Sequence, residues 1–256
     1  MRDQSFELRG SESRTLATVG AFRVVSVGDL RDHLDRPADP RAGDLRHLRE
    51  SGLVRSVTLD GHRDRVVTLT EKGRDLLESR RRTGGEEPRQ AFHAGIRKPR
   101  ELEHDTQQYR AYVRAAERLT SRGARLRRVL LDYELKREYQ RFLQKRNRHR
   151  ADSDGRPDRE AHEIATWALQ HDLPYFDEQV HFPDVRIEYE DLDGRSRYED
   201  IEVTTVHYRG AHAAAAARSG FSRYRSGSAC LSARGGTGRG RGGGRGGRGL
   251  AEELLL

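Results

Sequence analysis

Residues 48–74, LRESGLVRSVTLDGHRDRVVTLTEKGR, decide the fold of the N-terminal part of the chain. Gly52 ends a helical pattern, because glycine readily takes the left-handed conformation that closes a helix. Two short runs of alternating residues follow, and Asp60-Gly61 between them is typical of a hairpin turn. Thr70 is of a residue type that caps the next helix. The predicted elements are a helix over 41–52, strands over 54–59 and 65–70, and a helix over 71–82.

The segment before this stretch adds two more predicted helices. Apolar residues at helical spacing predict a helix over 15–25. Ser26 and Asp29 form a capping pattern that predicts the start of a short second helix. Two prolines then break the chain before residue 41. The order helix, helix, helix, hairpin and helix predicts a winged helix-turn-helix domain over 14–82, after a flexible N-terminus over 1–13.

The end of the third helix, the hairpin and the capped helix resemble winged-helix regulators of the MarR type over residues 48–55 and 69–74. The resemblance implies that the third helix lies in or near the major groove of duplex DNA, and that the hairpin, or wing, reaches a phosphate strand or the minor groove. Arginines on both elements would also give two separated phosphate contacts that orient the domain. The expected DNA-binding residues are Arg41, Arg46, Arg49, Arg63 and Arg65.

The composition favours a polyanionic partner. Of the 256 residues, 35% are charged and 34% are hydrophobic, which suits small domains with solvated helices better than one large globule. The formal net charge is +8, and arginine, whose planar fork binds phosphate well, supplies almost all of the basic excess. These arginines could also merely solvate a winged helix that contacts protein, so a protein-interaction module remains an alternative.

Cysteine usage and the lack of long apolar runs limit the environment of the protein. The single cysteine, Cys230, excludes an internal disulfide and a cysteine-based zinc site. No apolar run approaches the roughly 20 residues that a membrane span needs. The charged start of the chain lacks the apolar core of a signal peptide. We therefore expect a cytoplasmic, nucleoid-associated protein without a membrane partner.

The second half of the chain changes from helical to alternating patterns. After a linker over 83–100, we expect a helical connector over 101–172, whose helices could hold a homodimer together, and a small α/β domain over 173–227. The Arg/Gly-rich tail over 228–256 cannot bury enough apolar surface to fold, so we expect it to be disordered and able to bind nucleic acid non-specifically. The predicted elements are helices over 103–119, 125–148, 160–171 and 212–218, and strands over 184–190, 196–205 and 221–225.

A pair of carboxylates in this hairpin has the spacing of a nuclease motif. Asp184 follows Pro183, and Glu202 lies on the next strand, which resembles the Pro-Asp and (Asp/Glu)-x-Lys arrangement of restriction-endonuclease-like folds. The resemblance implies that Asp184 and Glu202, joined by Glu134 from a preceding helix, hold Mg²⁺ for phosphodiester cleavage. Thr204 stands where the lysine of that motif should be, which favours a degenerate or purely structural version.

One further arginine is a candidate phosphate-binding residue. Arg209 lies close to the start of the helix over 212–218, where the helix dipole favours an anion.

A winged helix joined to a hairpin domain also resembles, in outline, the replication-relaxation proteins of mobile elements.

Taken together, these patterns predict an α+β protein that binds double-stranded DNA. Its role would be that of a transcriptional regulator, or of a replication or mobilisation accessory. A Mg²⁺-dependent DNA endonuclease and a protein-interaction module are the alternatives. No cofactor is expected unless the chain is a nuclease.

Overall fold

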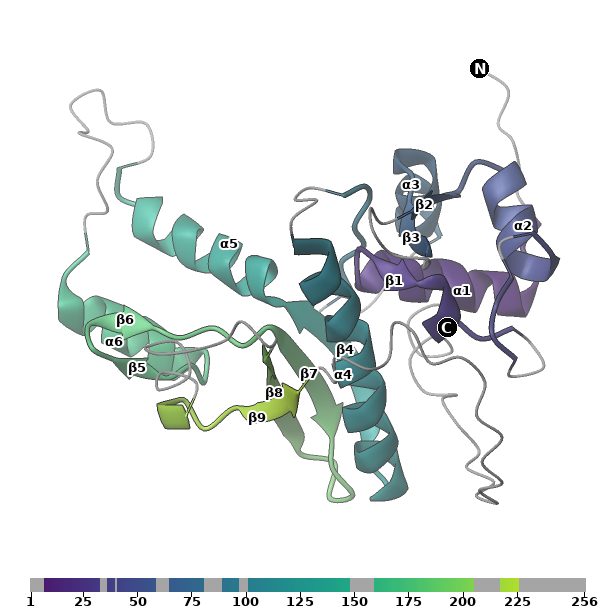
Figure 1. Cartoon of the computed structure of the whole chain (residues 1–256). Coiled ribbons are helices and arrows are strands. Elements are labelled where there is room, and N and C mark those ends of the chain that lie inside the picture. The colour runs from purple at the N-terminus through teal and green to yellow at the C-terminus, as the bar shows by residue number, and fades with distance from the viewer. Residues whose placement is uncertain are drawn as a thin grey trace.

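The computed structural model describes residues 7–32, 36–39, 41–58, 65–80, 89–96, 101–147, 159–204 and 217–225. It has the mixed α+β architecture that the sequence predicts, with an N-terminal and a C-terminal unit side by side (Figure 1). Within the described ranges, no helix combines the length and the apolar character that a bilayer crossing needs.

The N-terminal unit packs helices on a small antiparallel sheet. Its elements are α1 (Gly10–Ala21), β1 (Val25–Ser26), the 3-10 helix η1 (Val27–Asp29), α2 (Gly43–Glu50), β2 (Val54–Thr58), β3 (Arg65–Leu69) and α3 (Glu71–Ser79). The strand order is β1-β3-β2. Leu16 of α1, Leu48 of α2 and Leu69 of β3 are fully buried in the core between these elements.

The hairpin and the helix after it form as predicted. β2 and β3 pair along their whole length. Thr70 caps α3, because its Oγ1 accepts a hydrogen bond of 3.1 Å from the backbone N–H of Gly73. The predicted Asp60-Gly61 turn lies outside the described residues.

The first two predicted helices differ from the structure. α1 lies earlier than the predicted 15–25, so the expected flexible start over 1–13 is wrong from residue 10 onward, and Glu12 is buried. Residues 25 and 26 form β1 instead, because the β-branched Val25 fits the edge of the small sheet. Ser26 makes no side-chain cap, and the second helix is the short 3-10 turn η1.

The C-terminal unit is a mixed sheet with helices. Its elements are α4 (Leu102–Ser121), β4 (Arg125–Leu131), α5 (Asp132–Gln144), α6 (Ala161–Gln170), β5 (Tyr175–Phe176), β6 (Gln179–Val180), β7 (Val185–Glu190), β8 (Ser196–Thr204) and β9 (Ser222–Arg225). The sheet order is β4-β7-β8-β9, antiparallel except for the parallel pair β8 and β9. β5 and β6 form a separate hairpin. The predicted β7–β8 hairpin is confirmed.

The expected helical connector over 101–172 is wrong as a separate element. The helix predicted over 125–148 begins instead with strand β4, which pairs with β7 and so belongs to the sheet of the C-terminal unit. A short apolar run such as Val129 to Leu131 suits a buried strand as well as a helix, and pairing with Val185 and Ile187 decides between them. α4 packs on this sheet, against β4, β7 and β8.

The expected linker over 83–100 is also wrong for its described part, residues 89–96. Gln90 and Phe92 are each 5% exposed. The side-chain amide of Gln90 imitates a neighbouring strand: its Nε2 donates to the carbonyl of Val129 at 2.9 Å, and its Oε1 accepts from the Val129 N–H at 2.9 Å. The segment therefore satisfies backbone groups at the edge of β4, which lacks a partner strand on that side in the described sheet.

Replacing Gln90 by alanine should lower the free energy of unfolding by about 1–3 kcal/mol, because buried backbone groups of Val129 lose their partners. Urea denaturation measures this change. Gln170→Ala, at an exposed position of α6, is the control and should stay within about 0.5 kcal/mol of the wild type. Equal effects of the two substitutions would contradict the role of Gln90 as a strand mimic.

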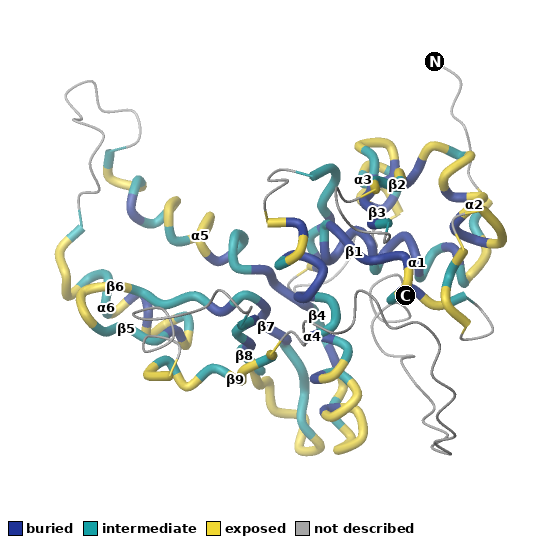
Figure 2. The backbone as a smooth tube through the Cα atoms, viewed as in Figure 1, coloured by how far each residue is buried: buried dark blue, intermediate teal, exposed yellow. Residues whose placement is uncertain are grey.

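The two units share one hydrophobic core. A single cluster of buried residues runs from α1 and β3 through α4 to β7 and β8. In Figure 2 the tube is dark over most of α1 and over shorter segments of the other elements, which alternate with teal and yellow ones in α4 and β8. Phe22, at the end of α1, contacts the rings of Tyr109 and Tyr112 in α4, with centroids 5.1 and 4.9 Å away. Arg110 Nε donates to Asp29 Oδ2 of η1 at 2.6 Å. The N-terminal unit is thus held firmly against α4.

Candidate nucleic-acid interface

α2 presents a polar face to solvent. Leu45 and Leu48 are buried against the rest of the N-terminal unit, whereas Arg46, Arg49 and Glu50 are exposed. This follows from helical geometry, since apolar residues three apart share the inward side of the helix. The face has the cationic side chains that the DNA-binding prediction needs.

Four of the five arginines predicted to bind DNA belong to the described residues, and they lie in three places. Arg41 is exposed two residues before α2, and Arg46 and Arg49 are exposed on α2 itself. Arg65, the first residue of β3, is half-buried. Arg63 lies outside the described residues, as does the rest of the segment between β2 and β3.

Arg46 and Glu50 form an ion pair on the outer face of α2. Arg46 Nε donates to Glu50 Oε1 at 2.7 Å, and the side chains are 57% and 52% exposed. The hydrogen bond raises the pKa of Arg46 and lowers the pKa of Glu50. Both side chains therefore remain charged under ordinary conditions, and the positive charge of this face is partly offset.

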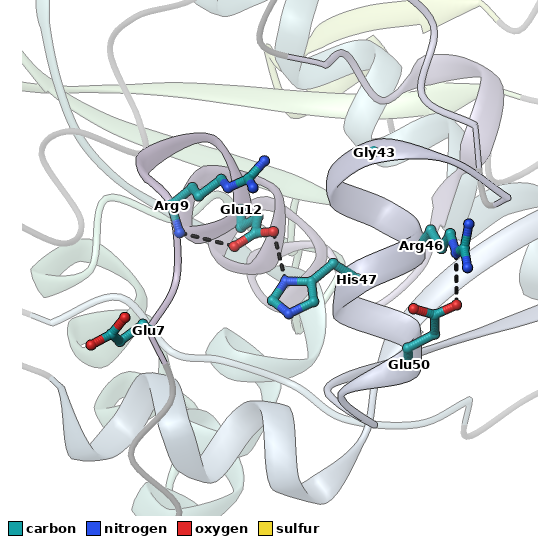
Figure 3. Close-up of a pocket in the computed structure, with 7 residues that line it drawn as sticks. All are labelled: Glu7, Arg9, Glu12, Gly43, Arg46, His47 and Glu50. Atoms are coloured by element: carbon teal, nitrogen blue, oxygen red, sulfur yellow. Dashed lines mark hydrogen bonds and ion pairs between the residues drawn. The ribbon is translucent and has the colours of Figure 1, made fainter.

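A pocket of about 420 Å³ lies beside this face, between α2 and the start of α1 (Figure 3). Glu12, which is 2% exposed, joins the two helices: its Oε2 accepts from the Arg9 backbone N–H at 2.9 Å, and its Oε1 lies 2.7 Å from His47 Nδ1. The buried carboxylate thus fixes α2 to α1. The pocket is lined by Glu7, Arg9, Glu12, Gly43, Arg46, His47 and Glu50.

In the C-terminal unit, the carboxylate of Asp184 lies against β8. Its Oδ2 accepts a hydrogen bond of 2.7 Å from the backbone N–H of Val203. Val185 pairs with Ile201, so the next position along the antiparallel strands sets Asp184 alongside Glu202. The structure therefore places Asp184 beside the part of β8 that carries Glu202.

Glu134 does not join this pair as expected. Its Oε1 accepts from the Leu131 backbone N–H at 3.2 Å and lies 3.5 Å from His93 Nε2. A carboxylate in the first turn of a helix turns back to the free N–H groups there, and Glu134 follows this rule. In the described part of the chain, no three Asp, Glu, His or Cys side chains are grouped so that they could hold a metal ion. The predicted acidic cluster is therefore not formed there.

His104 of α4 occupies the space beside Asp184 and was missed by the sequence analysis. Its Nε2 lies 3.3 Å from Asp184 Oδ2, and its Nδ1 lies 3.7 Å from Asp105 Oδ1. Burial by itself would lower the pKa of His104, but the bonds and charges of Asp105 and Asp184 outweigh burial and raise this pKa to about 10. The ring is therefore cationic at neutral pH.

These surroundings do not fit a Mg²⁺ ion at Asp184. Mg²⁺ needs carboxylate oxygens that are free to coordinate it. One oxygen of Asp184 already accepts the Val203 N–H and faces the cationic ring of His104, which would repel a second cation. The surroundings of Asp184 therefore do not support metal-dependent phosphodiester cleavage at this residue.

The ion pair of His104 with Asp184 should make stability depend on pH. The imidazole loses its proton near pH 6.5 when unfolded and near pH 10 when folded. The stabilisation is therefore complete below about pH 6.5 and is lost as the pH rises through about 10. His104→Gln should be clearly less stable than the wild type at pH 6, and this difference should shrink toward pH 10. Urea unfolding across this range measures it.

The control for this prediction is His162→Gln, because His162 is exposed on α6. Its difference from the wild type should stay small across the range. A difference between the wild type and His104→Gln that is the same at pH 6 and pH 10 would contradict the assigned ion pair.

Two predicted features lie outside the described residues. They are the candidate phosphate ligand Arg209, with most of the helix expected over 212–218, and the Arg/Gly-rich tail over 228–256.

Comparisons of the chain with protein-family models, with curated proteins and with solved structures found no match.

Proposed function

We propose that the N-terminal unit is a winged helix-turn-helix domain that binds duplex DNA, with α2 in the major groove and the β2–β3 hairpin as the wing. The observation that carries this proposal is the order α1, β1, η1, α2, β2, β3, α3 around a β1-β3-β2 sheet, with α2 turning arginines outward. A helix of this width fits the major groove, and exposed arginines suit phosphate and base edges.

The rigid attachment of this unit supports the same function. α2 is held to α1 by Glu12 and His47, and the unit shares its core with α4. A helix on such a scaffold needs little backbone reordering when it meets DNA, which lowers the cost of binding. DNA binding of this kind would serve transcriptional regulation, replication or mobilisation.

The test is the salt dependence of duplex binding by the full chain, measured by fluorescence anisotropy. Affinity should fall steeply between about 50 and about 200 mM salt, because bound arginines release counterions from the phosphates. Arg49→Ala should weaken binding and reduce the slope of log K against log salt by about 0.9, the value for one phosphate contact.

The matched control is Arg197→Ala, which removes one exposed arginine from the distant β7–β8 hairpin. This control should leave the slope unchanged. If the chain binds no duplex even at low salt, or if Arg49→Ala changes the slope no more than Arg197→Ala does, the proposal is wrong.

A further inference from the structure

Arg46 and Glu50 are arranged so that one end of the arginine fork stays available. They lie one helical turn apart on the outward face of α2, and Glu50 Oε1 accepts from Nε of Arg46 (Figure 3). The bond engages the inner nitrogen of the guanidinium. Glu50 does not bind the two Nη nitrogens at the far end of the fork. These two nitrogens are the donors that suit a bidentate acceptor.

We infer that Arg46 reads a guanine in the major groove through its two Nη groups, and that Glu50 is the positioning residue that holds the fork in this direction. Guanine presents O6 and N7 as a pair of acceptors, and arginine donating to both is the commonest specific contact with a DNA base. This inference rests on the proposed DNA binding and assigns the base class that α2 recognises.

The placement of Glu50 is hard to explain by stability or by non-specific binding. Both side chains are more than half exposed, so solvent screens the pair and it contributes little to folding. A carboxylate on a surface that meets phosphates also weakens non-specific attraction. Ordering a flexible arginine before binding is a benefit that outweighs this cost, because less side-chain freedom is then lost on the DNA.

The contact between His47 and Glu12 fixes how α2 is rotated about its own axis. His47, the residue after Arg46, is held by the buried carboxylate of Glu12, which is itself bound to the backbone of Arg9. Rotation of α2 about its axis would break this contact. Arg49 is exposed on the same helix and suits a phosphate contact instead.

The experiment begins by selecting binding sites from randomised duplexes with the full chain. Each guanine of the selected duplex is then replaced in turn by 7-deazaguanine, which pairs normally but lacks the N7 acceptor. At one position this change should weaken wild-type binding about tenfold or more, and Arg46→Ala should bind the two duplexes equally.

Variants of Glu50 separate positioning from charge. Glu50→Ala should lose most of the guanine preference while it binds unselected duplexes as tightly as the wild type or more tightly, because one negative charge is gone. Glu50→Gln keeps an acceptor for Nε and should retain most of the preference. Glu71→Ala is the matched control: it removes the carboxylate from the exposed Arg74 pair on α3 and should change neither property.

The outcomes distinguish this inference from the proposed function. Duplex binding without any selected sequence, or an equal 7-deazaguanine effect in the wild type and Arg46→Ala, would overturn the reading by Arg46 and leave DNA binding in place. Full selectivity in Glu50→Ala would overturn the positioning role. A preference that depends on Glu50 but not on Arg46 would make Glu50 a direct acceptor for cytosine and overturn the assignment. No duplex binding at all would overturn both.

Discussion

Arg186→Ala is expected to lower the free energy of unfolding by about 3–5 kcal/mol, because a buried ion pair would be left with one partner. Arg186, in β7, is 4% exposed, and its guanidinium binds both carboxylate oxygens of Asp200 in β8 at 2.7 and 2.8 Å. Urea denaturation of the full chain measures the loss.

The guanidinium of Arg186 also caps the C-terminal end of α6. Its Nη1 donates to the carbonyl of His171 at 2.7 Å and its Nη2 to the carbonyl of Asp172 at 2.9 Å, just after the end of α6. These carbonyls have no partner within the helix, and a cation is favoured at this negative end of the helix dipole. Arg186 therefore joins β7, β8 and α6, so alanine removes a connection as well as a charge.

Two further variants make this prediction specific. Arg186→Lys keeps the charge but cannot reproduce the planar fork, so it should recover only part of the stability. Arg197→Ala breaks the exposed pair with Asp191 and should cost less than about 1 kcal/mol. If Arg186→Ala and Arg197→Ala are equally stable, Arg186 does not hold the C-terminal unit together.

Local signals in the sequence were enough to predict elements whose ends are set by nearby residues. The cap at Thr70 fixes the start of α3 through a hydrogen bond between residues that are only three positions apart in the sequence. The β7–β8 hairpin follows from alternation and its turn, and the arginines of α2 point outward because Leu45 and Leu48 take the inward side. In each case the deciding contacts lie within one or two elements.

Features that depend on distant contacts could not be predicted. β4 carries residues that suit a helix, and it is a strand because β7 pairs with it some sixty residues later in the chain. The position of His104 beside Asp184 depends on how α4 packs on the sheet, which no local pattern encodes. For Glu12 there was a weak signal, since a glutamate three residues after the N-cap residue is typical of a capping box, but its contact with His47 required the tertiary structure.

Gly73→Ala is expected to destabilise the protein by about 3 kcal/mol, at the upper end of the usual cost of overpacking, although alanine is the better helix former by about 1 kcal/mol. A Cβ at Gly73 would lie 2.1 Å from the carbonyl oxygen of Leu53, which is backbone and cannot rotate away. That oxygen also accepts from the Thr70 N–H at 3.0 Å, so a shift would loosen the cap of α3 as well.

This close approach explains why a glycine follows the cap at this spacing. α3 must lie directly on the turn between α2 and β2, and the same turn sets the direction of α2. Gly10→Ala, where a Cβ would meet nothing within 4 Å, is the control and should leave stability unchanged or slightly higher. Urea denaturation compares the two variants. If Gly73→Ala proves as stable as Gly10→Ala, α3 does not pack on Leu53 as described, and the anchoring of the whole N-terminal unit would have to be reconsidered.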